Sequence, residues 1–127
     1  MALLLDTHVV VWWMAGDRRL RPKALRLIEG ERRRNDVYVS ALTGMELQYV
    51  AKGGFQRGAE GLRAALDEHG FRVLAFDLED GIRATELPRL HLDPFDRALI
   101  AQADRRQLML VTADEQIERY PIAVYRL

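Results

Sequence analysis

The chain has 127 residues, of which 49% are hydrophobic and 30% are charged. This length and composition are typical of one globular domain and exclude a disordered protein, so we expect a single domain over residues 1–127. The 19 Lys and Arg residues balance 19 Asp and Glu residues, and no cysteine is present. Net charge therefore gives no indication of a nucleic-acid partner, and disulfides, thiolate metal sites and a cysteine nucleophile are excluded.

The N-terminal segment has no basic region before its apolar residues and reaches Asp6 at once, unlike a secretory signal peptide. No apolar run approaches the ~20 residues that a membrane-spanning helix needs. Together with the absence of cysteine, these features predict a cytoplasmic location and no membrane partner.

Short apolar runs alternate with longer segments of helical periodicity. The expected strands are 2–5, 37–39, 71–76, 108–111 and 123–125, the last of them at a sheet edge. The expected helices are one after Asp6, 21–34 with Ala24, Leu25, Leu27 and Ile28 inward, one from Ser40 to Gly53 and Gly54, 58–68, 78–86 and 94–106. Strands that alternate with helices predict an α/β fold with parallel strands joined by right-handed crossovers.

Four acidic residues lie where strands give way to turns or helix starts, or on an apolar helix face. They are Asp6, Glu46, Asp96 and Asp114. In open parallel sheets ligands bind at the carboxyl ends of the strands. Carboxylates crowded there raise one another's pKa, and a divalent cation such as Mg²⁺ relieves the repulsion because it prefers oxygen ligands. The pattern predicts a metal site for phosphodiester hydrolysis.

Each acidic residue also has an ordinary structural interpretation. Asp6 could be the N-cap of the following helix, and Glu46 could reach from an apolar stripe to solvent. Thr112 and Asp114 could hold a water beside a metal, or could be a capping pair for a helix that begins near Glu115.

The segment around Asp93 separates these two interpretations. Asp93 is followed by Pro94, which is typical of an N-cap and the first helical position. Asp96 lies in the first helical turn and can face the strand ends. We therefore expect Asp93 to be the cap and Asp96 the ligand. Arg97 could pair with a carboxylate or contact a substrate phosphate.

The histidines and tryptophans give weaker indications. The three histidines have no zinc-type spacing; His69 is expected at a helix end, and His8 and His91 have no assigned role. Trp12 and Trp13 are adjacent helix positions that face different ways, so we expect core or interface residues rather than nucleobase platforms. The apolar helix that carries them is expected to expose a surface for a partner.

Taken together, four segments resemble the PIN-domain ribonucleases and, among them, the VapC-type toxins of prokaryotic type II toxin–antitoxin modules. The resemblance spans essentially the whole chain. The segments are Leu4-Leu5-Asp6-Thr7-His8, Val39-Ser40 through Glu46-Leu47 with Lys52-Gly53-Gly54 behind it, His91-Leu92-Asp93-Pro94-Phe95-Asp96-Arg97 with Ala98 to Ala103, and Leu110-Val111-Thr112-Ala113-Asp114.

This resemblance implies a PIN-like three-layer α/β fold, with a central, mostly parallel sheet between helices. It also implies an endoribonuclease that hydrolyses single-stranded RNA with one or two Mg²⁺ or Mn²⁺ ions, a cognate VapB-like antitoxin and a homodimer. The implied metal ligands are Asp6, Asp96 and Asp114, with Glu46 as a ligand or a water-mediated base and Thr112 as a supporting hydroxyl.

One position departs from the family pattern. Met45 stands where related sequences often carry an aromatic residue, and Gly44 loosens the same helix, which leaves the packing around Glu46 open.

Two rival functions follow from the same residues. An aspartyl-phosphate phosphatase would need a second Asp two residues after Asp6, where this chain has His8. A PIN domain that binds RNA or protein without cleaving it is the alternative from another class. The presence of all four acidic residues disfavours this silent form, and a cleavage assay with and without EDTA separates the two.

Overall fold

A computed structural model of the chain describes residues 1–50 and 58–127. The strands are β1 (Leu3–Leu5), β2 (Val37–Ser40), β3 (Arg72–Leu74), β4 (Met109–Thr112) and β5 (Val124–Arg126). The helices are α1 (Thr7–Ala15), α2 (Pro22–Arg33), α3 (Ala41–Val50), α4 (Gly58–His69), α5 (Leu78–Glu86) and α6 (Pro94–Arg106), with a 3₁₀ helix η1 (Ile117–Arg119). The expected helix stop at Gly53 and Gly54 lies outside the described residues.

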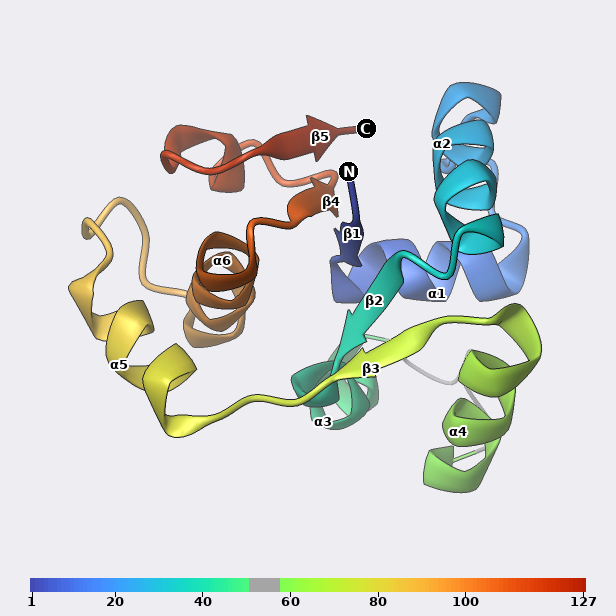
Figure 1. Cartoon of the computed structure of the whole chain (residues 1–127), viewed down its shortest axis with the longest axis horizontal. Coiled ribbons are helices and arrows are strands. Elements are labelled where there is room, and N and C mark those ends of the chain that lie inside the picture. Colours follow the sequence, from blue (N-terminus) through green and yellow to red (C-terminus); the bar gives the residue numbers. More distant parts are fainter. Residues whose placement is uncertain (51–57) are drawn as a thin grey trace.

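The strands form one five-stranded sheet in the order β3-β2-β1-β4-β5, with every neighbouring pair parallel (Figure 1). The predicted α/β class with a mostly parallel sheet is confirmed. From β1 the chain adds β2 and β3 on one side and then crosses to β4 on the other side. The direction of winding therefore reverses between β1 and β4, and ligands bind at the carboxyl ends of strands at such a point.

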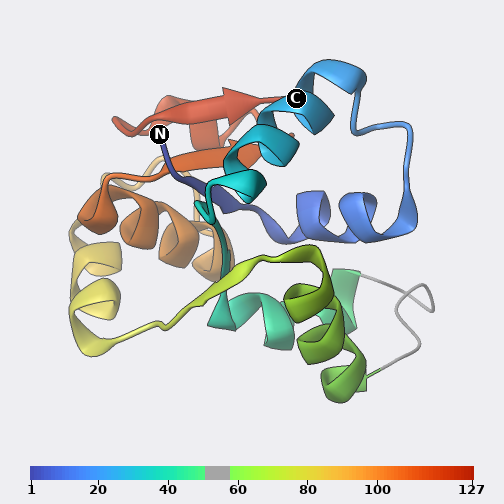
Figure 2. The same cartoon turned by 45° about the vertical axis from the view of Figure 1, so that its right-hand side comes forward.

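Two apolar cores cover the two faces of the sheet, because successive side chains of a strand point to opposite faces. Leu3 and Leu5 belong to the core that also contains residues of α1, α2 and α4, whereas Leu4 belongs to the core with α5 and α6. Figures 1 and 2 both show these two groups of helices on opposite sides of the sheet. The three leucines are completely buried, as expected for a central strand of a parallel sheet that is covered on both faces.

Local capping agrees with the sequence pattern at three helix starts. Asp93 Oδ1 accepts hydrogen bonds from the backbone N–H groups of Phe95 and Asp96 at 2.9 and 3.0 Å. Asp77 forms a capping box with Asp80 at the start of α5. Ser40 Oγ accepts from the backbone N–H of the second residue of α3 at 3.1 Å. The predicted role of Asp93 as the cap of α6 is confirmed.

One core residue was predicted wrongly. Leu25 is 40% exposed, although Ala24 and Ile28 of the same helix are buried. The buried stripe of α2 follows the i, i+4 spacing of these two residues. Leu25 lies one position further round the helix and faces solvent.

The expectation that α1 exposes an apolar surface to a partner stays a prediction, because Val11, Trp12, Trp13 and Met14 are only partly buried. Val9 and Val10 are completely buried, and Trp12, Trp13 and Met14 pack against the same core. Among the described residues, the most exposed large apolar side chains are instead Leu92 at 79% and Leu78 at 76%. No helix within the described ranges is long and apolar enough to cross a membrane.

Candidate metal centre

The four acidic residues predicted from the sequence line one pocket at the carboxyl ends of β1 and β4. The pocket has a volume of about 300 Å³. Its lining residues are Asp6, His8, Trp12, Glu46, Asp93, Asp96, Ala113 and Asp114. Segments from both ends of the chain and from two helices therefore meet at the reversal point of the sheet.

Asp6 follows the last residue of β1 and occupies the N-cap position of α1, but its side chain makes no capping hydrogen bond. Its Oδ2 atom instead accepts a hydrogen bond from Thr112 Oγ1 at 2.7 Å. Asp6 is 5% exposed. This burial raises the pKa of Asp6, and the hydrogen bond from Thr112 offsets only part of that effect. The capping interpretation of Asp6 therefore does not describe its side chain.

Thr112 connects two of the acidic residues. While its hydroxyl donates to Asp6, the same Oγ1 atom accepts a hydrogen bond from the backbone N–H of Asp114 at 3.0 Å. Asp114 Oδ1 in turn accepts from the backbone N–H of Gln116 at 2.9 Å. The turn after β4 thus uses the capping contacts that the ordinary interpretation predicts, and in doing so it fixes the Asp114 carboxylate at the pocket.

Glu46 of α3 is held by a threonine that sequence reasoning did not single out. Thr7 Oγ1 donates to Glu46 Oε1 at 2.5 Å and lies 3.0 Å from Thr43 Oγ1. Burial raises the pKa of Glu46, and the neighbouring charge of Asp6 raises it further, while the Thr7 hydroxyl lowers it. The only sequence signal for Thr7 was its place directly after Asp6.

The unusual residues beside Glu46 do not displace it. Met45 is 51% exposed and so makes little contribution to the core. A Cβ atom added to Gly44 would lie 3.6 Å from Leu62 Cδ2 of α4, an ordinary contact distance. The contact with Thr7, rather than a neighbouring aromatic ring, positions the Glu46 carboxylate.

Asp96 is the most perturbed of the four carboxyl groups. It lies in the first turn of α6, where Asp93 caps its backbone N–H. Burial, together with the charges of Asp6, Asp93, Asp114 and Glu46, raises the pKa of Asp96 to about 8. The folded chain without a cation therefore favours a proton on this group near neutral pH.

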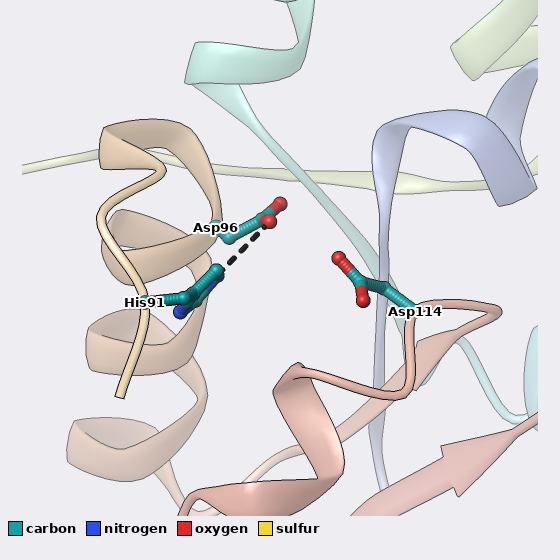
Figure 3. Close-up of side chains that lie close together, drawn as sticks. All are labelled: His91, Asp96 and Asp114. Atoms are coloured by element: carbon teal, nitrogen blue, oxygen red, sulfur yellow. Dashed lines mark hydrogen bonds and ion pairs between the residues drawn. The ribbon is translucent and has the colours of Figure 1, made fainter. Parts of the chain in front are cut away.

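A histidine lies beside this carboxyl group. His91 Nε2 is 3.2 Å from Asp96 Oδ2 (Figure 3). One ligand atom each from His91, Asp96 and Asp114 fall within 4.8 Å of one another, and Figure 3 shows the two carboxylates facing each other from α6 and the turn after β4. Partly buried carboxylates that repel one another offer the oxygen ligands that a hard divalent cation prefers. The residues present therefore fit such an ion.

Arg97 has a structural role that the sequence left open. Its guanidinium donates to the carbonyl oxygens of Pro88 and Ala84 at 2.8 Å and of Leu87 at 3.0 Å. Carbonyl oxygens at the end of α5 otherwise lack partners within the helix. Arg97 thus fixes the connection between α5 and α6 and is not among the residues that line the acidic pocket.

The two adjacent tryptophans separate as their helical spacing predicts. Trp13 Nε1 donates to His69 Nδ1 at 3.1 Å and its ring packs against Phe71. Trp12 also contacts the core, but it lines the pocket as well, with the Arg19 guanidinium 4.7 Å from the ring centre. The prediction of a core residue is confirmed for Trp13, whereas Trp12 has one side available to a bound molecule.

An open parallel sheet with acidic residues gathered where its winding reverses defines a class of α/β proteins suited to phosphodiester chemistry. The PIN domain model matches residues 3–123, and the chain belongs to the PIN-domain family. The chain is 28% identical over 130 residues to ribonuclease VapC22 of Mycobacterium tuberculosis. The alignment covers 97% of this chain and 98% of that protein.

Solved structures share the fold over the whole chain. VapBC2 from Rickettsia felis, bound to a DNA fragment from its promoter, aligns with a TM-score of 0.77 at 18% identity and covers 100% of this chain and 99% of that chain. A toxin–antitoxin complex from Klebsiella pneumoniae aligns with a TM-score of 0.70 at 22% identity, over 99% and 100%. At these identities the likeness concerns the fold.

Proposed function

We propose that the protein is a Mg²⁺- or Mn²⁺-dependent endoribonuclease that hydrolyses single-stranded RNA, and that it is the toxin of a toxin–antitoxin pair. The observation that carries the proposal is the convergence of Asp6, Glu46, Asp96 and Asp114 on one pocket. The match to a curated ribonuclease over nearly the full length of both chains supports the choice of RNA as the substrate.

In this proposal Asp96, Asp114 and Asp6 would hold the ion. The bound cation supplies positive charge that offsets the carboxylates and stabilises the charge that develops on the reacting phosphate. Thr112 keeps the Asp6 carboxylate in place by its 2.7 Å hydrogen bond, and the turn after β4 keeps Asp114 in place. The protein thus fixes its ligands before substrate arrives.

Glu46 has a different part in the proposed reaction. Its raised pKa suits a group that accepts a proton near neutral pH. We assign Glu46 the role of general base, which takes a proton from the attacking water. The oxygen of that water forms a bond to phosphorus while the bond from phosphorus to the leaving oxygen breaks. Thr7 holds one oxygen of Glu46 and leaves the other for that proton.

Single-stranded RNA fits the wall of the pocket. RNA without a duplex exposes its bases, and aromatic side chains bind them by stacking. Trp12 and His8 both line the pocket, with ring centres 6.0 Å apart. We assign to Trp12 the base next to the scissile phosphate.

The partners follow from the relatives. We propose a cognate VapB-like antitoxin, since full-length structural neighbours include toxin–antitoxin complexes. We also propose a homodimer, for which Leu78, Ile82 and Leu92 offer exposed apolar surface. Light scattering on the purified protein tests the dimer, and a monomer at micromolar concentration would contradict it.

A cleavage assay tests the central proposal. The purified protein should cut single-stranded RNA with Mg²⁺ or Mn²⁺, should stop when EDTA is added, and should lose activity on Asp114→Asn. Asp67→Asn is the matched control, because Asp67 is an exposed residue of α4. If the wild-type protein binds RNA but does not cleave it even with Mg²⁺ or Mn²⁺ present, the silent alternative would be established instead.

A further inference from the structure

Behind the Asp96 carboxylate, a chain of hydrogen bonds runs through three side chains from different parts of the fold. Arg97 Nη1 donates to the Tyr120 hydroxyl oxygen at 3.1 Å. That oxygen lies 2.8 Å from His91 Nδ1, and His91 Nε2 lies 3.2 Å from Asp96 Oδ2. Tyr120 is 3% exposed and the His91 side chain 14%, so little water competes for these contacts.

The position of the protons follows from the Tyr120 oxygen. It accepts one hydrogen bond from Arg97 and a second from the backbone N–H of His91 at 3.3 Å. A hydroxyl group has two acceptor positions and one proton to donate. Both acceptor positions are filled, so the proton is donated. The nearer acceptor is His91 Nδ1 at 2.8 Å, since the His91 carbonyl oxygen is 3.5 Å away.

This donation selects one form of the His91 ring. If Nδ1 accepts, the neutral imidazole carries its proton on Nε2. That N–H group faces Asp96 Oδ2, which accepts in the ionised form that a cation requires. Nε2 then has no lone pair for a metal ion, although His91 falls within the same 4.8 Å group as Asp96 and Asp114.

We propose that His91 is a positioning residue that holds Asp96, and that Tyr120 sets its tautomer, while neither binds the ion. The inference rests on the metal-dependent function proposed above. His91 fixes the Oδ2 atom of Asp96 and leaves the other carboxylate oxygen for the cation beside Asp114. Imidazole–carboxylate pairs of this kind orient a ligand without touching the metal.

Nitrogen NMR on the wild-type protein saturated with Mg²⁺, which keeps Asp96 ionised, tests the tautomer directly. Protein labelled with ¹⁵N-histidine should give a His91 ring with a proton on Nε2 and a bare Nδ1, assigned by loss of the signal in His91→Gln. Tyr120→Phe should mix the two tautomers. A proton on Nδ1 in the wild-type protein would overturn the inference.

Calorimetry with Mn²⁺ alone tests the positioning role. His91→Ala should weaken Mn²⁺ binding about 10-fold. His91→Gln should restore most of that loss, because its amide can donate to Asp96 in the same way. The Mn²⁺ affinity of Tyr120→Phe should lie between those of wild type and His91→Ala. Tyr125→Phe removes a hydroxyl from β5 and should leave the Mn²⁺ affinity unchanged. Equal Mn²⁺ affinity in His91→Ala and wild type would refute the positioning role and leave the nuclease proposal standing.

Electron spin echo measurements on bound Mn²⁺ separate positioning from direct ligation. Wild type should show no coupling to a directly bound ¹⁴N nucleus. A ¹⁴N coupling that disappears in His91→Ala would make His91 a ligand and overturn the inference. A wild-type protein that binds no Mn²⁺ at all would overturn the metal-dependent function, and this inference with it.

Discussion

Replacing Asp96 by Asn should stabilise the metal-free protein. The pKa of Asp96 is about 8 in the folded chain, against 3.8 for an ordinary Asp side chain. At pH 7 the folded state keeps a proton that the unfolded chain has released. Between the ordinary pKa of 3.8 and the raised pKa, each pH unit lowers the free energy of unfolding by about 1.4 kcal/mol. At pH 7 the loss of stability is therefore about 4 kcal/mol. The four carboxylates share this repulsion, and their positions can adjust to reduce it in the wild-type protein. We therefore expect Asp96→Asn to raise the free energy of unfolding by about 2 to 4 kcal/mol.

The dependence on pH has a definite sign. Between the ordinary Asp pKa and about 8 the folded state binds more protons than the unfolded state. The free energy of unfolding of the wild-type protein in EDTA must therefore decrease as the pH rises through this window. Asparagine is neutral in both states, so Asp96→Asn should show a flatter profile.

Urea denaturation in EDTA at pH 5, 7 and 8 measures both effects, with Asp67→Asn as the control that should leave stability unchanged. With saturating Mg²⁺ the wild-type protein should become the more stable of the two, because it binds the ion more tightly than Asp96→Asn and bound ligand stabilises the folded state. An Asp96→Asn protein less stable than wild type in EDTA at pH 7 would refute the reasoning and would assign Asp96 a structural role in α6.

Three further outcomes follow from the same site. Thr112→Val removes the hydroxyl that donates to Asp6 and should weaken Mn²⁺ binding about 10-fold by calorimetry; unchanged affinity would show that Asp6 needs no support. Trp12→Ala should raise KM for an RNA oligonucleotide by about 5-fold or more with little change in kcat, since stacking one base contributes about 1–3 kcal/mol, and Trp12→Phe should keep most of the affinity; a loss confined to kcat would contradict the stacking role. An antitoxin that inserts an Arg or Lys into the acidic pocket would pair with Asp96, so Asp96→Asn should weaken antitoxin binding tenfold or more; if binding is unchanged while cleavage is lost, the antitoxin covers the groove without entering the metal site.

The parts of the fold that depend on local pattern could be predicted from the sequence. Buried strands read as short apolar runs, and Asp93 followed by Pro94 is a local signal for a helix start. Asp6 and Asp114 could be placed at strand ends for the same reason, and parallel topology then brings those ends to one edge of the sheet.

Contacts between distant segments could not be predicted in this way. Thr7 and Glu46 are 39 residues apart, and His91 and Tyr120 are 29 apart, so nothing in the local sequence pairs them. His91 flanks an acidic motif in the sequence, but a search for zinc-type spacing finds only direct ligands and misses a histidine that holds another ligand. Trp12 was grouped with Trp13 because helical spacing says that the two rings diverge but not which one faces the pocket.

The order in which the site's parts leave the ribosome has a consequence for synthesis of the protein. Asp6 and its partner Thr112 are 106 positions apart, and β4 is the neighbour that β1 needs on one side. Any nascent or prematurely terminated chain that stops before β4 lacks both the Thr112 hydroxyl and Asp114. If the protein is the nuclease proposed above, a chain without β4 should be inactive, because it lacks both the support of Asp6 and one of the proposed metal ligands.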